Sequence, residues 1–81
     1  MKKLEIVRLM MDNDYKFGGE VLGDAVNKYA KYADAAYYDK YLLFKKDGEM
    51  LFINTYVGAL GRRIIKVSEN GNYRTYATDK F

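Results

Sequence analysis

Two short dipeptides constrain the fold of this 81-residue chain more than any other feature. Asp-Gly at positions 47–48 and Asn-Gly at positions 70–71 each separate two runs that are rich in β-branched and aromatic residues. Both dipeptides tolerate the positive φ angles of a two-residue type I′ turn, so each predicts a β-hairpin. We expect the paired strands of these hairpins to lie within residues 41–57 and 62–79.

A further glycine-rich reversal connects the two hairpins. Residues 58–61 read Gly-Ala-Leu-Gly, and the two glycines permit a sharp change of chain direction. Strands that follow one another through short turns pair most simply with their neighbours in the sequence. The sequence therefore predicts an antiparallel meander of four strands.

A helical pattern precedes the hairpins, from about Glu20 to Tyr38. Asp24 lies four residues before Lys28, an order that favours a helical ion pair, and Gly18-Gly19 breaks the chain just ahead. The apolar residues at spacings of three and four are Val21, Leu22, Ala25, Val26, Tyr29, Tyr32, Ala33 and Ala36. Together they form a single apolar stripe, which predicts one amphipathic helix.

The segment from Lys2 to Met11 fits two structures. Leu4, Val7 and Met11 lie at helical spacing and favour a short helix, whereas the apolar residues also suit a strand that is buried on both faces. We favour the strand. The predicted fold is then a single α+β domain over residues 1–81, with one helix packed on an antiparallel β-meander in the order β-α-β-β-β-β.

The composition excludes many kinds of active site. The chain has no Cys and no His, so it lacks a disulfide framework, a thiolate nucleophile, an imidazole base and a structural zinc site. Asp12 and Asp14 are interpreted as loop residues rather than magnesium ligands. A third hypothesis, a histidine-free ribonuclease, would use Arg62, Arg63, Arg74, Tyr73 and Tyr76. We predict that the protein is not an enzyme and needs no cofactor or metal.

The expected location follows from hydropathy and residue usage. No apolar run approaches the roughly 20 residues that span a bilayer, and Glu5 and Arg8 interrupt any signal-peptide core. Residues encoded by AT-rich codons dominate the chain, which suits a low-GC bacterium or its phage. We expect a protein of the bacterial cytoplasm that does not act at a membrane.

The turns also predict which side chains share a sheet face. In the first hairpin the register pairs Lys46 with Glu49, which leaves Phe44 opposite Leu51 on the core face. With a two-residue turn in the second hairpin as well, aromatic and basic side chains gather on the opposite face. We predict a partner-binding surface that consists of Tyr41, Phe52, Tyr56, Arg62, Lys66 and Tyr73.

This face has two interpretations. The N-terminal segment or Phe81 covers it and makes it a second, minor core, or it stays exposed and binds a partner. Tyrosine and arginine are enriched at binding hot spots, and exposed clusters of such residues mark interaction sites. An apolar outer face would also serve a homodimer.

Tyrosine content and charge lead to the favoured function. Tyr outnumbers Phe nine to four and the net charge is only +3, which is typical of an adhesive surface that is not strongly apolar. In size and composition the chain resembles the small proteins with which phages block host machinery, including anti-CRISPR and anti-restriction factors. We predict a non-enzymatic inhibitor that binds a host protein or a protein–nucleic acid assembly.

The alternative is a domain that binds single-stranded nucleic acid, because bases stack on tyrosine and phenylalanine while lysine and arginine follow the phosphates. The proposed face resembles an RNA recognition motif in outline. The chain departs from that motif in having no evident second helix, and residues 48–53 do not match its aromatic strand signature. A charge of +3 is also small for several phosphate contacts.

Overall fold

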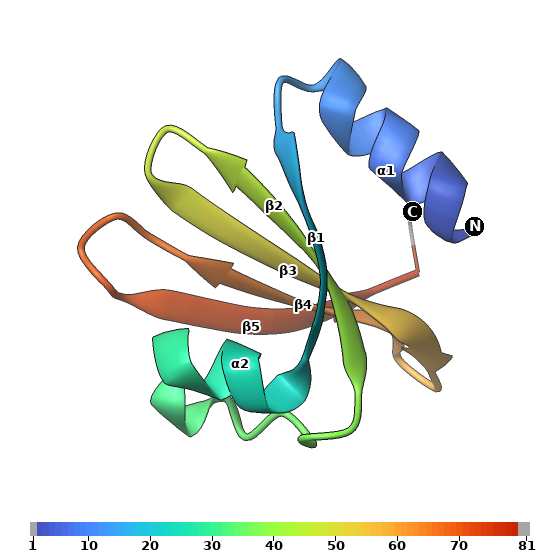
Figure 1. Cartoon of the computed structure of the whole chain (residues 1–81). Coiled ribbons are helices and arrows are strands. Elements are labelled where there is room, and N and C mark those ends of the chain that lie inside the picture. Colours follow the sequence, from blue (N-terminus) through green and yellow to red (C-terminus); the bar gives the residue numbers. More distant parts are fainter. Residues whose placement is uncertain (1, 80–81) are drawn as a thin grey trace.

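A five-stranded antiparallel sheet with a helix on each face forms the fold of this computed structural model, which describes residues 2–79 (Figure 1). The elements in chain order are α1 (Lys3–Asp12), β1 (Lys16–Leu22), α2 (Gly23–Tyr29), the 3₁₀ helix η1 (Lys31–Ala33), β2 (Lys40–Lys46), β3 (Glu49–Gly58), β4 (Gly61–Val67) and β5 (Tyr73–Thr78). The strands lie in the sheet in the order β1-β2-β3-β4-β5. The predicted α+β class and the four-stranded meander are therefore confirmed.

The register of the first hairpin is also confirmed. Lys46 pairs with Glu49 and Phe44 pairs with Leu51, as a two-residue turn requires. Asp47 and Gly48 both have positive φ angles, of 52° and 82°, which is the signature of a type I′ turn. The local turn chemistry thus determines which residues of β2 and β3 share a face.

The predicted register of the second hairpin is wrong by one residue. Val67 pairs with Tyr73, and only Gly71 of the turn has a positive φ, of 90°. The Gly71 N–H donates to the Ser68 carbonyl at 2.9 Å and the Ser68 N–H donates to the Asn72 carbonyl at 2.7 Å. This is a three-residue loop with a glycine bulge instead of a two-residue turn. The slip moves every β5 side chain to the opposite face.

The N-terminal segment is a helix, so the predicted strand is wrong. Ile6 and Met10, one turn apart, are buried against the sheet, while Leu4 and Met11 are exposed. A strand would have placed Arg8 on the same face as Ile6 and Met10, whereas the helix turns Arg8 towards solvent. Avoiding that buried charge favours the helix.

The single helix predicted from Glu20 to Tyr38 is confirmed only over Gly23–Tyr29, and both of its ends are wrong. The predicted order β-α-β-β-β-β is therefore replaced by α-β-α-β-β-β-β. The first residues of the predicted helix belong to β1, where Val21 pairs with Tyr41, and α2 ends at Tyr29. Pairing with β2 is a tertiary contact, and it overrides the local helical pattern of these residues. Gly18 and Gly19 lie at an irregularity of β1 between Phe17 and Glu20, and do not form a break ahead of a helix.

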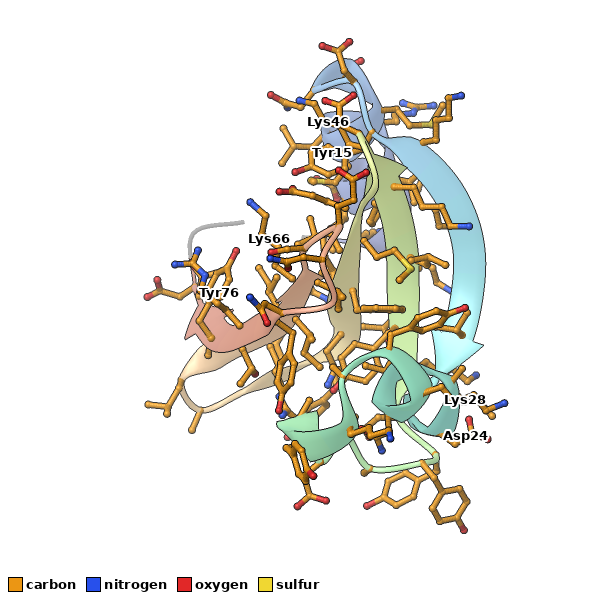
Figure 2. The ribbon with its side chains drawn as sticks, turned by 90° about the vertical axis from the view of Figure 1, so that its left-hand side faces the viewer. Tyr15, Asp24, Lys28, Lys46, Lys66 and Tyr76 are labelled. Carbon is orange, nitrogen blue, oxygen red and sulfur yellow. The ribbon has the colours of Figure 1, made fainter. Side chains whose placement is uncertain are left out.

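Each face of the sheet has its own core. The second core expected over Tyr41 and Phe52 is present, but α2 covers it and the N-terminal segment covers the other face. Phe81, the other expected cover, lies outside the described residues. The α1 side contains Ile6, Met10, Leu42, Phe44, Leu51, Ile53 and Ile64, and the α2 side contains Val26, Ala30, Ala33, Ala35, Tyr41, Leu43, Phe52, Ile65 and Val67. The two helices lie far from one another in both views (Figures 1 and 2). Because each face is packed against a helix, the sheet is apolar on both sides. Within residues 2–79, no helix combines the length and the apolar character needed to cross a membrane.

Candidate interaction surface

The six predicted binding residues do not form one exposed surface. Tyr41 and Phe52 are buried beneath α2, and Tyr73 packs at the margin of the same core. These three side chains lie on the α2 face. The expectation that they are exposed is therefore wrong for Tyr41 and Phe52, whose aromatic area stabilises the fold.

Arg62 and Lys66 lie on the other face, because the strand register places them in line with Ile64 of the α1-side core. The Arg62 guanidinium is buried and donates to the carbonyl groups of Asn54 and Thr55, at 2.8 and 3.0 Å. It fixes the point where the pairing of β3 with β4 becomes irregular. Lys66 pairs with Glu49 at 3.5 Å. Of the six predicted residues, only Tyr56 is largely exposed.

A different part of the chain carries exposed tyrosines. Residues 29–38, called here the tyrosine-rich segment, run from the end of α2 through η1 into the loop before β2. Tyr29, Tyr32, Tyr37 and Tyr38 are 53%, 87%, 70% and 68% exposed. The rings of Tyr37 and Tyr38 meet edge to face at 5.4 Å. Four large amphipathic side chains in ten residues form an extensive contact surface.

Polar contacts from outside the segment hold its backbone. The Asn27 side-chain amide donates to the Ala35 carbonyl at 2.8 Å and accepts from the Ala35 N–H at 2.9 Å. The Arg63 guanidinium of β4 donates to the Ala33 carbonyl. Ala33 and Ala35 are themselves buried against the sheet. The segment therefore has a fixed path although most of it has no regular secondary structure.

Gly23 permits the return of the chain beside α2. The Gly23 N–H donates to the Asp39 carbonyl at 2.8 Å, and a Cβ atom at Gly23 would lie 2.0 Å from the Ala36 carbonyl oxygen. Only a glycine allows such a close backbone approach. The conformation of the segment thus depends on a residue that lies before it.

Side chains of the sheet connect the segment to the core below. The Tyr29 ring stacks on Phe52 at 6.1 Å, and the Arg63 Nε donates to the Thr75 Oγ1 at 3.2 Å. Tyr41 lies buried on this face, and burial raises the pKa of its phenol, while the nearby Arg63 charge acts in the opposite direction. Arg63 therefore links β5, the core and the segment.

Charges around the segment are balanced. Residues 23–40 contain three lysines and three aspartates, and Figure 2 shows one of each, Lys28 and Asp24, projecting from α2. Asp24 accepts the Ala25 N–H at 2.8 Å. A surface of this kind lacks the one-sided positive field that a polyanion requires.

The tip of the β2–β3 hairpin is a second candidate site. A hollow there is lined by Asp14, Lys16, Lys45, Lys46, Asp47, Gly48, Glu49 and Met50. The Lys46 Nζ donates to the Asn13 carbonyl at 3.1 Å and lies 5.2 Å from the centre of the Tyr15 ring (Figure 2). This lysine is thus engaged within the protein. In residues 2–79, no three carboxylates converge as metal ligands.

Comparison with known proteins gives no family for this chain. It matches no protein-family model, and it has no significant similarity to a curated protein or to a solved structure.

Sequence reasoning missed the tyrosine-rich segment because it assigned those residues to a long helix. Tyr29 and Tyr32 were expected in the buried stripe of that helix, and Tyr37 and Tyr38 were expected at the C-terminal end of the helix. One signal was available in the sequence. Four tyrosines fall within ten residues, and the single apolar stripe of an amphipathic helix is too narrow to bury all four.

Proposed function

We propose that this protein is a non-enzymatic binding protein that uses its tyrosine-rich segment to occupy a surface of a partner protein. The observation that supports this most is the combination of four exposed tyrosines with an anchored backbone. Tyrosine supplies rigid contact area at a low cost in side-chain entropy. A surface that is already ordered before binding loses less entropy when the complex forms.

A protein target suits this surface better than a nucleic acid. The three lysines and three aspartates of residues 23–40 offer paired polar contacts rather than a track for phosphates. The nucleic-acid alternative requires exposed aromatic side chains on the sheet face, but Tyr41 and Phe52 are covered by α2. The ribonuclease hypothesis is weakened as well, since Arg62 and Arg63 donate to backbone carbonyl groups.

The proposed setting is a phage or low-GC bacterium, with the protein in the bacterial cytoplasm as an inhibitor of the anti-CRISPR or anti-restriction type. Its support is the small size, the AT-rich residue usage and the tyrosine content of the chain. Inhibition would follow from steric occupation of a host protein, or of a protein within a nucleic-acid complex, because exposed aromatic side chains typically become interface anchors.

A capture experiment with two matched variants tests this proposal. The platform variant carries Y32A, Y37A and Y38A, and the control variant carries Y56A and L60A, which remove large exposed side chains elsewhere. Immobilised proteins are incubated with low-GC bacterial lysate, and retained proteins are quantified by mass spectrometry. We expect a partner that the wild type and the control retain and that the platform variant loses by about tenfold or more.

Two results would contradict the proposal. Equal retention by both variants would show that the tyrosine-rich segment is not the contact surface. Salt-sensitive binding of labelled single-stranded DNA or RNA that depends on Tyr32, Tyr37 and Tyr38 would instead favour the nucleic-acid alternative.

A further inference from the structure

The two edges of the sheet differ in how well they are protected against pairing with another strand. At one edge, β1 is irregular at Gly18 and Gly19, and its Glu20 forms an ion pair with Lys3 of α1 at 2.7 Å. Bulges and charges of this kind discourage an additional strand. At the other edge, β5 pairs with β4 at six consecutive positions without irregularity. Within residues 2–79, no strand covers its outer side.

The turn before β5 determines which of its backbone groups point outward. Ser68 donates to the Asn72 carbonyl, so this pair is hydrogen-bonded, and bonded and non-bonded pairs alternate along an antiparallel ladder. The residues of β5 that bond to β4 are then Arg74, Tyr76 and Thr78. The outward N–H and C=O groups belong to Tyr73, Thr75 and Ala77, a set that is symmetric about Thr75.

We propose that β5 pairs antiparallel with β5 of a second copy of this chain, with Thr75 opposite the second copy's Thr75. In this register Tyr73 of each copy lies opposite the other copy's Ala77. All three outward N–H groups and all three outward C=O groups of each copy then find partners, giving six hydrogen bonds. A register shifted by two residues would leave one of the three residues opposite a loop.

The side chains of β5 complement each other in the same register. Arg74 is the one charged residue of the strand, and it lies opposite the second copy's Tyr76 on the α1 side. The pairing places no like charges directly opposite one another and allows a cation–π contact twice by symmetry. Tyr76 is 44% exposed and lies on the side of the sheet away from β1 (Figure 2). This interface is independent of the tyrosine-rich segment.

Cysteine cross-linking tests the register directly, because the chain contains no native cysteine. Opposed residues of a hydrogen-bonded antiparallel pair have Cα atoms about 5.5 Å apart, which suits a disulfide. T75C should therefore form a covalent dimer on mild oxidation. A77C is the matched control, because the two Ala77 positions would lie about 13 Å apart along the strands.

The expected result is at least tenfold more dimer for T75C than for A77C at equal concentration. Equal cross-linking of both variants would indicate random collision and would overturn the proposal, as would the absence of a dimer with either. Circular dichroism confirms that both variants are folded.

A second pair of variants addresses the unmodified interface. In sedimentation experiments at increasing concentration, the wild-type mass should rise from 9.4 kDa towards twice that value. T75P removes the outward N–H but no backbone hydrogen bond to β4, so it should remain monomeric and folded. It also removes the Arg63–Thr75 side-chain hydrogen bond, which T75V removes equally. T75V keeps the N–H and should still dimerise. A monomeric wild type over the whole range, or dimerisation of T75P equal to that of T75V, would contradict the proposal.

Discussion

The central strands and the tyrosine-rich segment are neighbours in the fold but are held in different ways. β2 and β3 are aligned by their own turn at residues 47–48 and are buried on both faces by apolar side chains. Residues 29–38 bury mainly Ala30, Ala33 and Ala35, and their path depends on polar contacts from Asn27 and Arg63. The central strands thus provide most of the stability, whereas the tyrosine-rich segment presents the exposed tyrosines. Changes to the core should unfold the protein, and changes to the anchors should loosen the segment.

The largest effect is expected in the core. Phe52 is buried on the α2 side, where Tyr29 stacks on its ring. F52A removes this ring and leaves a cavity, so we expect the free energy of unfolding to fall by about 3–5 kcal/mol. Urea denaturation measures the change. Y32A is the matched aromatic control on the segment, and it should alter stability by no more than about 0.5 kcal/mol. Similar losses for both variants would remove the distinction between core and segment.

Gly23 should show the next largest effect, at the point where the segment returns to α2. The added methyl group of G23A would collide with the Ala36 carbonyl oxygen, so the backbone at residue 23 or at residue 36 must shift. We expect a loss of about 1–3 kcal/mol, measured by urea denaturation.

G18A is the control for this prediction. Its Cβ would lie 3.0 Å from the Leu43 side chain, which can move, and 3.5 Å from the Leu43 carbonyl oxygen, an ordinary van der Waals contact. The chemical-shift changes of G23A should be concentrated in residues 30–39. A G23A protein as stable as the wild type, with unchanged shifts there, would refute the close approach of these two segments.

Loss of the Asn27 anchor should have a smaller and more local effect. N27A removes both hydrogen bonds to Ala35 and leaves the backbone groups of Ala35 without this partner. We expect a destabilisation of about 1–2 kcal/mol in urea denaturation. N72A, which changes an exposed asparagine, should cost less than about 0.5 kcal/mol. If N27A behaves like N72A, Asn27 does not hold the segment.

The smallest effect concerns the buried phenol of Tyr41. Burial raises the pKa of this group in the folded protein above its unfolded value of about 10. The neutral phenol therefore contributes stability that is fully present below pH 10 and is lost as the pH rises through the folded pKa. Y41F should lose less stability than the wild type between pH 9 and pH 11. Parallel pH profiles for the two proteins would show that Tyr41 titrates as it does in the unfolded chain.

The same contrast explains what could be predicted from the sequence. Register in β2 and β3 depends on a turn of two residues, so the pairing of Phe44 with Leu51 was predictable. The second hairpin also contains Asn-Gly, but its loop includes Glu69 and closes through Ser68, which the dipeptide alone does not reveal. One extra loop residue was enough to place Tyr73 on the wrong face.

The candidate site was much less predictable. Residues 20–38 have a helical apolar pattern, but the contacts that interrupt it are tertiary. Val21 pairs with Tyr41 of β2, Arg63 of β4 donates to Ala33, and Gly23 lies against Ala36. Such contacts between distant residues override local propensity and leave no short-range signal. The exposed tyrosines therefore became visible only once the fold was known.

Amide hydrogen exchange at Ala35 is the most direct measurement of whether the tyrosine-rich segment has a fixed backbone. The Ala35 N–H donates to the Asn27 Oδ1, so it should exchange at least about tenfold more slowly than in an unstructured chain. N27A should abolish this protection while the amides of β2 and β3 stay protected. Exchange of the Ala35 amide in the wild type at the rate of an unstructured peptide would contradict the pre-ordered surface on which the proposed function depends.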